Sequence, residues 1–312
     1  MFKKVIPVSL IAILITCTCY AQKKAVWLDS DTGNEMDDLY AITYLLKDPQ
    51  VNVVGLSSAH FNNADMLVGD KWHYYPTKNI NTVQLSQDLN EQLLQLNSRT
   101  DVPHPLGSRG TIGHSWGGKN PVISAAEKGI IAAVHQLKDG EKLDVLCIGA
   151  ASNIASAIQL DTTIIPKIRV YVLAARYFSD RKVWDKSEFN VRNDLNAFDL
   201  LLNCKGLDLT VMPINTAIAL RFNRTVCRTN LKDKGKLGEL LYNRWDFVEA
   251  KDTWVMWDLA LVMAYLDPSK AEKIQATGPP ENEQREVSVY KNIDAKAMEQ
   301  DFWNRMNLFT VK

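Results

Sequence analysis

Five carboxylates lie within ten residues near the start of the chain, from Asp29 to Asp38. No Lys or Arg lies among them, so the like charges would raise one another's pKa values unless a positive group approaches. A bound divalent cation would supply that charge, and ligands that are all oxygen favour a hard ion such as calcium or magnesium. The spacing therefore predicts a carboxylate site that binds a metal ion.

The flanking residues indicate where this acidic loop, residues 29–38, lies in the fold. An apolar run at residues 25–28 precedes the loop, and residues 39–46 after it have the composition of a helix. The loop therefore joins a strand to a helix at the carboxyl end of the strand, which is where open α/β sheets place their ligands.

Apolar runs of strand length alternate with helical stretches along the rest of the chain. This alternation predicts an α/β fold with a mostly parallel central sheet and helices on both faces. Residues 100–120 and 176–193 break the alternation and are predicted to be long loops, which in compact domains are commonly functional. The predicted strands are residues 51–57, 142–149, 168–174 and 208–213, and the predicted helices are residues 120–137, 153–159 and 195–204.

The first 21 residues have the pattern of a secretory signal peptide, with Lys3 and Lys4, an apolar core and a cleavage site ending at Ala21. The apolar core is too short to span a membrane. Removal of this signal peptide would leave residues 22–312 as a single domain, which is expected to be exported to the periplasm or secreted. The alternative is a lipoprotein signal with an acylated Cys17, for which Thr16 is a poor preceding residue.

Charge and cysteine content exclude several classes of protein. The formal charge of zero becomes −2 without Lys3 and Lys4, so no global field favours nucleic acid or an anionic membrane surface. Three well-separated cysteines remain after the signal, and they form neither a disulfide framework nor a zinc pattern.

Three interpretations of the acidic loop compete at this point. An EF-hand fails, because counting from Asp29 puts Asn34 at the sixth position and Tyr40 at the twelfth, where Gly and Glu are needed. A haloacid dehalogenase-like phosphatase also begins with strand-Asp-x-Asp, but it usually continues Gly-Thr and has no use for the pair at 37–38. The third interpretation is a solvated acidic turn.

The loop also resembles the signature of the inosine–uridine-preferring nucleoside hydrolase family, Asp-x-Asp-x-Gly-x-Asp-Asp. Two extra residues between Gly33 and Asp37 make it similar to a divergent branch of that superfamily. Further matches follow in the family's order along the chain. They are the end of the second strand at Asn62, a strand and glycine turn around Ile148, the Glu188-Phe189-Asn190 segment, and Trp257-Asp258.

Each match also has a purely structural explanation. Asn62 could cap a turn, Asn153 could cap a helix, Glu188 could lie on the surface, and Asp258 could begin a helix, where carboxylates are favoured. Their occurrence in the family's order favours the resemblance.

The resemblance implies a nucleoside hydrolase-like fold and calcium-dependent hydrolysis of the N-glycosidic bond of ribonucleosides. It implies a small-molecule nucleoside as substrate and a homo-dimer or homo-tetramer as the assembly. Asp29 would hold the loop, and Asp31 would act as general base. The implied ligands of one Ca²⁺ ion are Asp31, Asp38, Asp258 and the Ile148 carbonyl, and the implied substrate-binding residues are Asp37, Asn62, Glu188, Asn190 and Trp257.

The largest departure from the family concerns the leaving base. The nonspecific branch has a His before the last metal Asp, and here that residue is Trp257. His114 is the best remaining proton donor, and Trp257 could instead stack on a purine, which would slightly favour purine nucleosides. A Trp in an apolar stretch is also commonly a core residue. A catalytically weak nucleoside- or sugar-binding protein is therefore the second hypothesis.

Overall fold

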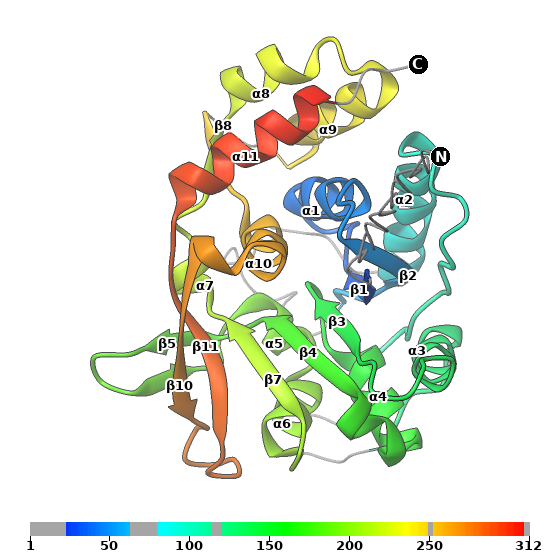
Figure 1. Cartoon of the computed structure of the whole chain (residues 1–312), viewed down its shortest axis with the longest axis vertical. Coiled ribbons are helices and arrows are strands. Elements are labelled where there is room, and N and C mark those ends of the chain that lie inside the picture. The colour runs from blue at the N-terminus through cyan, green and yellow to red at the C-terminus, as the bar shows by residue number, and fades with distance from the viewer. Residues whose placement is uncertain (1–22, 63–79, 114–119, 249–251, 309–312) are drawn as a thin grey trace, which may run out of the picture.

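A seven-stranded sheet in the order β10-β11-β7-β4-β3-β1-β2 forms the centre of the computed structural model (Figure 1). All neighbouring strands are parallel except the edge pair β10–β11. The structure describes residues 23–62, 80–113, 120–248 and 252–308, so the predicted signal peptide, Cys17 and His114 lie outside it. The strands are β1 (Lys24–Ser30), β2 (Val51–Ser58), β3 (Leu143–Cys147), β4 (Ile168–Leu173), β7 (Asp208–Met212), β10 (Ala271–Thr277) and β11 (Glu286–Ile293).

Helices cover both faces of the sheet, because successive strand residues point to opposite sides. Val26 and Leu28 face one apolar core, which α1, α9, α10 and α11 complete, while Trp27 between them faces the other core, which α3, α4 and α6 complete. The helices are α1 (Asp37–Leu46), α2 (Thr82–Leu96), α3 (Ala125–His135), α4 (Ser152–Leu160), α5 (Phe189–Asn193), α6 (Leu195–Asn203), α7 (Ile214–Ala217), α8 (Arg224–Leu231), α9 (Gly235–Phe247), α10 (Trp257–Leu266) and α11 (Ala295–Leu308).

Strand order places a crevice beside β1. The chain passes from β1 to its neighbour β2 on one side, and then to β3 on the other side of β1. Ligands of open α/β sheets bind at such a reversal of strand order, beyond the carboxyl ends of the strands. The acidic loop leaves the carboxyl end of β1, so it lies at this crevice.

The α/β class, the mostly parallel sheet and the four strands predicted after the acidic loop are confirmed, with shifts of one or two residues at the strand ends. The predicted helix at residues 120–137 begins later, at Ala125, because the Ser124 side chain caps it by accepting the N–H of Ala126 at 3.2 Å.

The prediction of a long loop at residues 176–193 was wrong. This segment holds a small hairpin, β5 (Arg176–Phe178) with β6 (Val183–Asp185), and then α5. Strands of three residues that pair only with each other are too short to show the hydrophobic period that reveals a strand.

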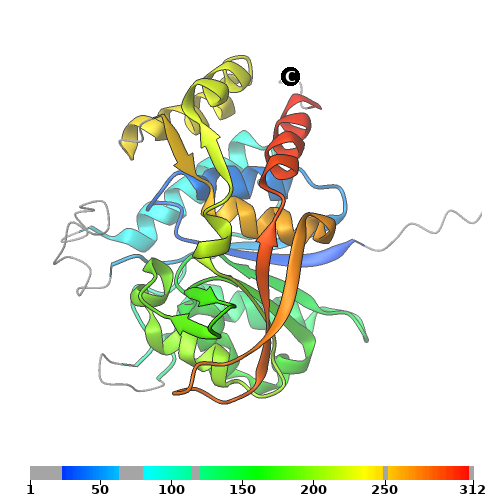
Figure 2. The ribbon, with the colours of Figure 1, turned by 90° about the vertical axis from the view of Figure 1, so that its left-hand side faces the viewer.

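A group of helices stands at one end of the molecule, next to the C-terminal α11. It consists of α8, α9 and the hairpin β8 (Arg221–Asn223) with β9 (Thr253–Val255) (Figures 1 and 2). Tyr40 of α1 bonds α9 through its hydroxyl, which donates to Leu241 O at 3.0 Å. In the described ranges, no helix combines the length and apolar character needed to cross a bilayer.

Candidate active site

A pocket of about 180 Å³ opens at the carboxyl ends of the central strands. It gathers eight of the ten predicted site residues from four separate parts of the sequence. They are Asp31, Asp37, Asp38, Ile148, Glu188, Asn190, Trp257 and Asp258. The pocket is also lined by residues that sequence analysis did not assign, namely Asn34, Glu35, Leu173, Arg176, Phe189 and Ile214.

The first turns of α1 and α10 bring three carboxylates together. Asp37 and Asp38 begin α1, and Asp258 lies in the first turn of α10. The backbone N–H of Asp258 donates to Asp37 Oδ2 at 2.8 Å. One oxygen from each of the three side chains lies within 4.8 Å of the other two. Carboxylates are favoured at helix N-termini, and here two such termini meet.

Asp31 reaches the pocket from the end of β1 because Gly149 lets it approach. A Cβ atom on Gly149 would lie 2.9 Å from the Asp31 nitrogen and 3.0 Å from its Cβ, so the turn after β3 requires glycine. Asp31 Oδ2 is buried and has no hydrogen-bond partner in the described part of the chain.

Burial raises the pKa values of this cluster. It raises the pKa of Asp38 to about 6 and, together with repulsion from Asp38, that of Asp37 to about 7. The pKa values of Asp31 and Asp258 rise well above their usual range, first through burial and then through neighbouring carboxylates. These acids therefore resist full ionisation at neutral pH unless a cation joins them.

Asp29 is held away from the pocket. It is fully buried, and its Oδ1 accepts Ser57 Oγ at 2.6 Å and Asn153 Nδ2 at 2.8 Å. Asn153 also accepts the N–H of Ser108 at 2.8 Å, so it links three segments instead of capping α4. Asp29 thus holds the loop, as expected. An attacking nucleophile must reach its substrate, so this position does not suit the phosphatase alternative.

The Glu188–Asn190 segment enters the pocket through a helix cap. Glu188 accepts the N–H groups of Asn190 at 2.9 Å and Val191 at 3.1 Å at the start of α5. Asn190 Nδ2 donates to Ile148 O at 3.1 Å and Leu173 O at 3.2 Å, which ties together the ends of β3 and β4. Glu188 is buried, so the alternative explanation that it lies on the surface was wrong.

Replacing Glu188 by Gln is expected to flatten part of the pH dependence of stability. Burial raises the pKa of Glu188 to about 7, and the backbone hydrogen bonds that lower this pKa offset only part of the effect of burial. A carboxyl whose folded pKa is raised contributes most below its unfolded pKa, and that contribution is lost as pH rises through about 7. Between pH 5 and 8 wild type should lose up to about 3 kcal/mol relative to Glu188→Gln. Urea unfolding of both proteins measures this difference, and parallel pH profiles would contradict it.

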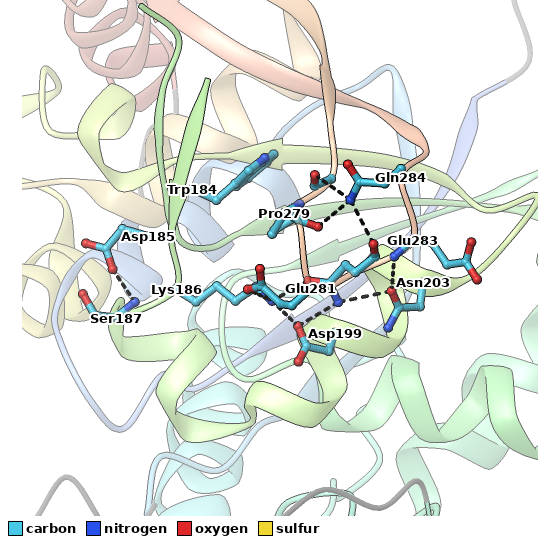
Figure 3. Close-up of polar contacts among 12 residues, drawn as sticks. Trp184, Asp185, Lys186, Ser187, Asp199, Asn203, Pro279, Glu281, Glu283 and Gln284 are labelled. Carbon is cyan, nitrogen blue, oxygen red and sulfur yellow. Dashed lines mark hydrogen bonds and ion pairs between the residues drawn. The ribbon is translucent and has the colours of Figure 1, made fainter. Parts of the chain in front are cut away.

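Residues just before Glu188 are anchored to the loop between β10 and β11 (Figure 3). Lys186 Nζ contacts Asp199 Oδ1 at 2.6 Å and Glu281 Oε1 at 2.8 Å, and it donates to Asn282. Trp184 Nε1 donates to Thr277 O at 2.9 Å. The C-terminal hairpin therefore fixes the segment that carries the pocket's Glu and Asn side chains.

One predicted residue, Asn62, does not line the pocket, and another, His114, lies outside the described residues. The amide of Asn62 donates to Arg109 O at 3.3 Å, and Asn62 is absent from the lining of the pocket among the described residues. His114 falls in the range that the structure does not describe. Their roles in substrate binding and catalysis stay predictions.

A positive charge that was not predicted from the sequence reaches the acidic loop. Arg244 of α9 donates to Gly33 O at 2.7 Å and to Glu35 O at 3.0 Å. No local signal links residues so far apart in the chain. Arg176 was not predicted either, although its place just after the carboxyl end of β4 could have indicated a pocket residue. Its Nη1 donates to Asp185 at 3.3 Å and Ser187 at 3.2 Å.

The acidic residues fit a hard divalent cation. Two oxygens bound to one calcium at about 2.4 Å each lie at most about 4.8 Å apart, and the Asp37, Asp38 and Asp258 oxygens meet that limit. Asp37 Oδ1 and Asp31 Oδ2 are buried without a hydrogen-bond partner in the described chain, which is costly unless a ligand satisfies them. The Ile148 carbonyl has a second lone pair beside the one that Asn190 uses.

Comparison with known proteins connects this chain to one family. Residues 26–300 match the family described as inosine-uridine preferring nucleoside hydrolase. The chain is 24% identical over 245 residues to "Probable uridine nucleosidase 2" of Arabidopsis thaliana, covering 70% of this chain and 68% of that protein. It is 26% identical over 241 residues to "Pyrimidine-specific ribonucleoside hydrolase RihB" of Escherichia coli O17:K52:H18 (strain UMN026 / ExPEC), covering 72% and 71%.

Solved structures share the fold. The plant nucleoside hydrolase PpNRh1 superimposes with a TM-score of 0.70 at 19% identity, covering 91% of this chain and 98% of its own. An inosine-guanosine nucleoside hydrolase superimposes with a TM-score of 0.70 at 16% identity, covering 93% and 99%. A purine-preferring ribonucleoside hydrolase from Gardnerella vaginalis gives 0.69 at 16% identity, covering 91% and 98%.

Proposed function

Since this chain belongs to the inosine–uridine-preferring nucleoside hydrolase family, we propose that it hydrolyses the N-glycosidic bond of ribonucleosides, as enzymes of that family do. We propose further that it uses one bound Ca²⁺ ion and slightly prefers purine nucleosides. The observation that carries the proposal is the meeting of three buried carboxylates from α1 and α10 within 4.8 Å of one another. An oxygen-only cluster of this kind suits calcium better than softer transition metals.

The side chains of the pocket would serve as calcium ligands and as the general base. Asp38, Asp258 and the Ile148 carbonyl would hold the ion with Asp31, and Asp37 is close enough to Asp38 and Asp258 to join them or to bind ribose hydroxyls. When bound, calcium lowers the pKa of a water molecule that it orients. Asp31 would remove the proton from that water as general base.

The same carboxylates would favour bond cleavage directly. Cleavage of a glycosidic bond develops positive charge on the sugar, in an oxocarbenium-like transition state. Fixed negative charges aimed at the sugar stabilise that charge without reorganising during the reaction. Glu188 and Asn190 would bind the sugar hydroxyls, and backbone contacts hold both side chains in the pocket.

Release of free ribose from nucleosides tests this function. Purified protein with calcium is expected to hydrolyse at least one of inosine, guanosine, adenosine, uridine and cytidine, and to lose that activity with chelator. Nucleoside binding measured by calorimetry, with no ribose released from any of the five, would favour the weak binding protein. Trp257 in place of a base-side His is the observation that makes this second outcome worth testing.

Trp257→Ala is expected to raise KM for inosine and guanosine about tenfold, and to raise KM for uridine less. Trp257 lines the pocket beside Asp258, and aromatic stacking contributes about 0.5–1.5 kcal/mol beyond the area that it buries. Uridine offers a smaller ring, so it loses less. Trp257→Phe keeps an aromatic ring and serves as the control. Equal effects on purine and pyrimidine nucleosides would contradict base stacking by Trp257.

The preference for purine over pyrimidine nucleosides is the most specific part of the proposed function. The similar sequences above carry uridine or pyrimidine names, whereas two of the similar structures carry inosine, guanosine or purine names. Steady-state constants for the five nucleosides decide between them. We also propose export through the N-terminal signal and assembly of two or four copies, which N-terminal sequencing of the mature protein and light scattering would test.

A further inference from the structure

The acidic loop contains an insertion that must be held in place. Compared with the family signature, two extra residues lie between Gly33 and Asp37. Extra backbone in a loop adds conformational freedom, and this insertion separates Asp31 from Asp37 and Asp38. Any movement in it would spread the carboxylates that must meet at one ion.

One side of the loop is fastened to α2. Thr32 Oγ1 donates to Asn90 Oδ1 at 2.5 Å, and the N–H of Gly33 donates to Ser86 Oγ at 3.2 Å. These bonds reach the loop before the insertion. They leave the carbonyl groups of the loop to be satisfied from elsewhere.

The other side is fastened by one arginine. Arg244 Nη2 donates to Gly33 O at 2.7 Å and lies 3.5 Å from Thr32 O, and Arg244 Nε donates to Glu35 O at 3.0 Å. Its guanidinium stacks on the Phe247 ring at 3.7 Å from the ring centre, and the residue is only 7% exposed. The planar fork of an arginine suits several fixed acceptors at once.

Arg244 touches the backbone of the loop through every hydrogen bond described above. It therefore fixes Gly33, just before the insertion, and Glu35, within the insertion, to the same guanidinium. We propose, building on the calcium site of the proposed function, that Arg244 is a positioning residue that holds the inserted residues so that Asp31, Asp37 and Asp38 are arranged for the ion before it binds.

The positive charge of Arg244 would affect calcium affinity in the opposite direction from positioning of the loop. A positive charge near the site repels Ca²⁺, so its removal alone would tighten calcium binding. Arg244→Lys keeps the charge but loses the fork, and Arg244→Met loses both. Positioning predicts weaker calcium binding in both variants, whereas a charge effect predicts tighter binding in the Met variant only.

Arg285 provides a matched control. It also donates to three backbone carbonyls, those of Leu202 at 2.8 Å, Leu207 at 2.8 Å and Leu201 at 2.9 Å. These bonds lie at the amino ends of β7 and β11, on the edge of the sheet opposite the pocket. Arg285→Met therefore removes the same kind of contact without reaching the acidic loop.

The experiment measures two quantities in the four proteins: calcium affinity by calorimetry, and hydrogen–deuterium exchange of residues 33–38 in the chelated protein. We expect Arg244→Lys and Arg244→Met to raise the calcium Kd about tenfold or more and to speed exchange in the loop, as expected for a positioning residue near a metal site. Arg285→Met should lower the melting temperature and leave both quantities unchanged.

Either of two results would overturn the proposal. One is loop exchange in both Arg244 variants as slow as in wild type. The other is calcium affinity in both variants equal to or higher than that of wild type. A wild-type protein that binds no calcium would instead overturn the proposed cofactor, and the exchange measurement would still decide whether Arg244 holds the loop.

Discussion

Asp31→Asn is expected to lower kcat by roughly 10²–10⁴-fold, the range that general-base catalysis contributes. The substitution keeps the size of the side chain but removes its ability to take a proton. Asp31 Oδ2 has no hydrogen-bond partner in the described chain, so the loss falls on catalysis and calcium binding, not on the fold. Ribose release at saturating calcium and inosine measures it.

The same substitution should stabilise the calcium-free protein, by about 0.5–2 kcal/mol. Asp31 is buried, and repulsion from Asp38 and Glu35 helps to keep its pKa raised. A neutral amide removes that repulsion, so the chelated variant should melt at a higher temperature than chelated wild type. Ser57→Ala is a control that disturbs the buried support of Asp29 without changing charge. Activity within tenfold of wild type would show that Asp31 is not the base.

The part of the site that lies in one stretch could be predicted from sequence. Asp31 follows a strand, and Asp37 and Asp38 begin the helix after it, so this local arrangement places all three near the carboxyl end of the strand. Glu188 and Asp258 were found only through their order along the chain, because nothing in their own neighbourhoods distinguishes a pocket residue from a helix cap. In the structure both are pocket residues at the starts of helices.

The contacts that support the site could not be predicted. Arg244 meets Gly33 across 211 positions in sequence, and an arginine on an amphipathic helix ordinarily faces solvent. The anchoring of Lys186 by Asp199 and Glu281 depends on how a hairpin folds back over α6, which strand periodicity does not report. Side chains that bond backbone groups of distant segments leave no spacing pattern to read.

Removing calcium is expected to abolish hydrolysis and to lower the melting temperature, and both effects should be reversed by adding calcium. Calcium at 100 times its Kd stabilises the folded state by about 2.7 kcal/mol. Magnesium should restore less activity, because it demands a smaller octahedral site and gives up its water reluctantly. Activity that survives exhaustive chelation, with metal analysis confirming that the protein is empty, would contradict a calcium enzyme.

The stabilisation by calcium should also grow as pH rises from 5 to 8. Burial raises the pKa of Asp38 to about 6 and that of Asp37 to about 7. Raised pKa values mean that the calcium-free protein is most stable below the unfolded pKa values and loses stability as pH rises through 6 to 7. Calcium binds the ionised carboxylates, so its affinity rises over the same range. Melting curves with calcium and with chelator should therefore diverge with pH, and Asp258→Asn should reduce the divergence because it removes one carboxylate from the cluster. A gap between the two curves that is constant with pH would place the ion away from these acids.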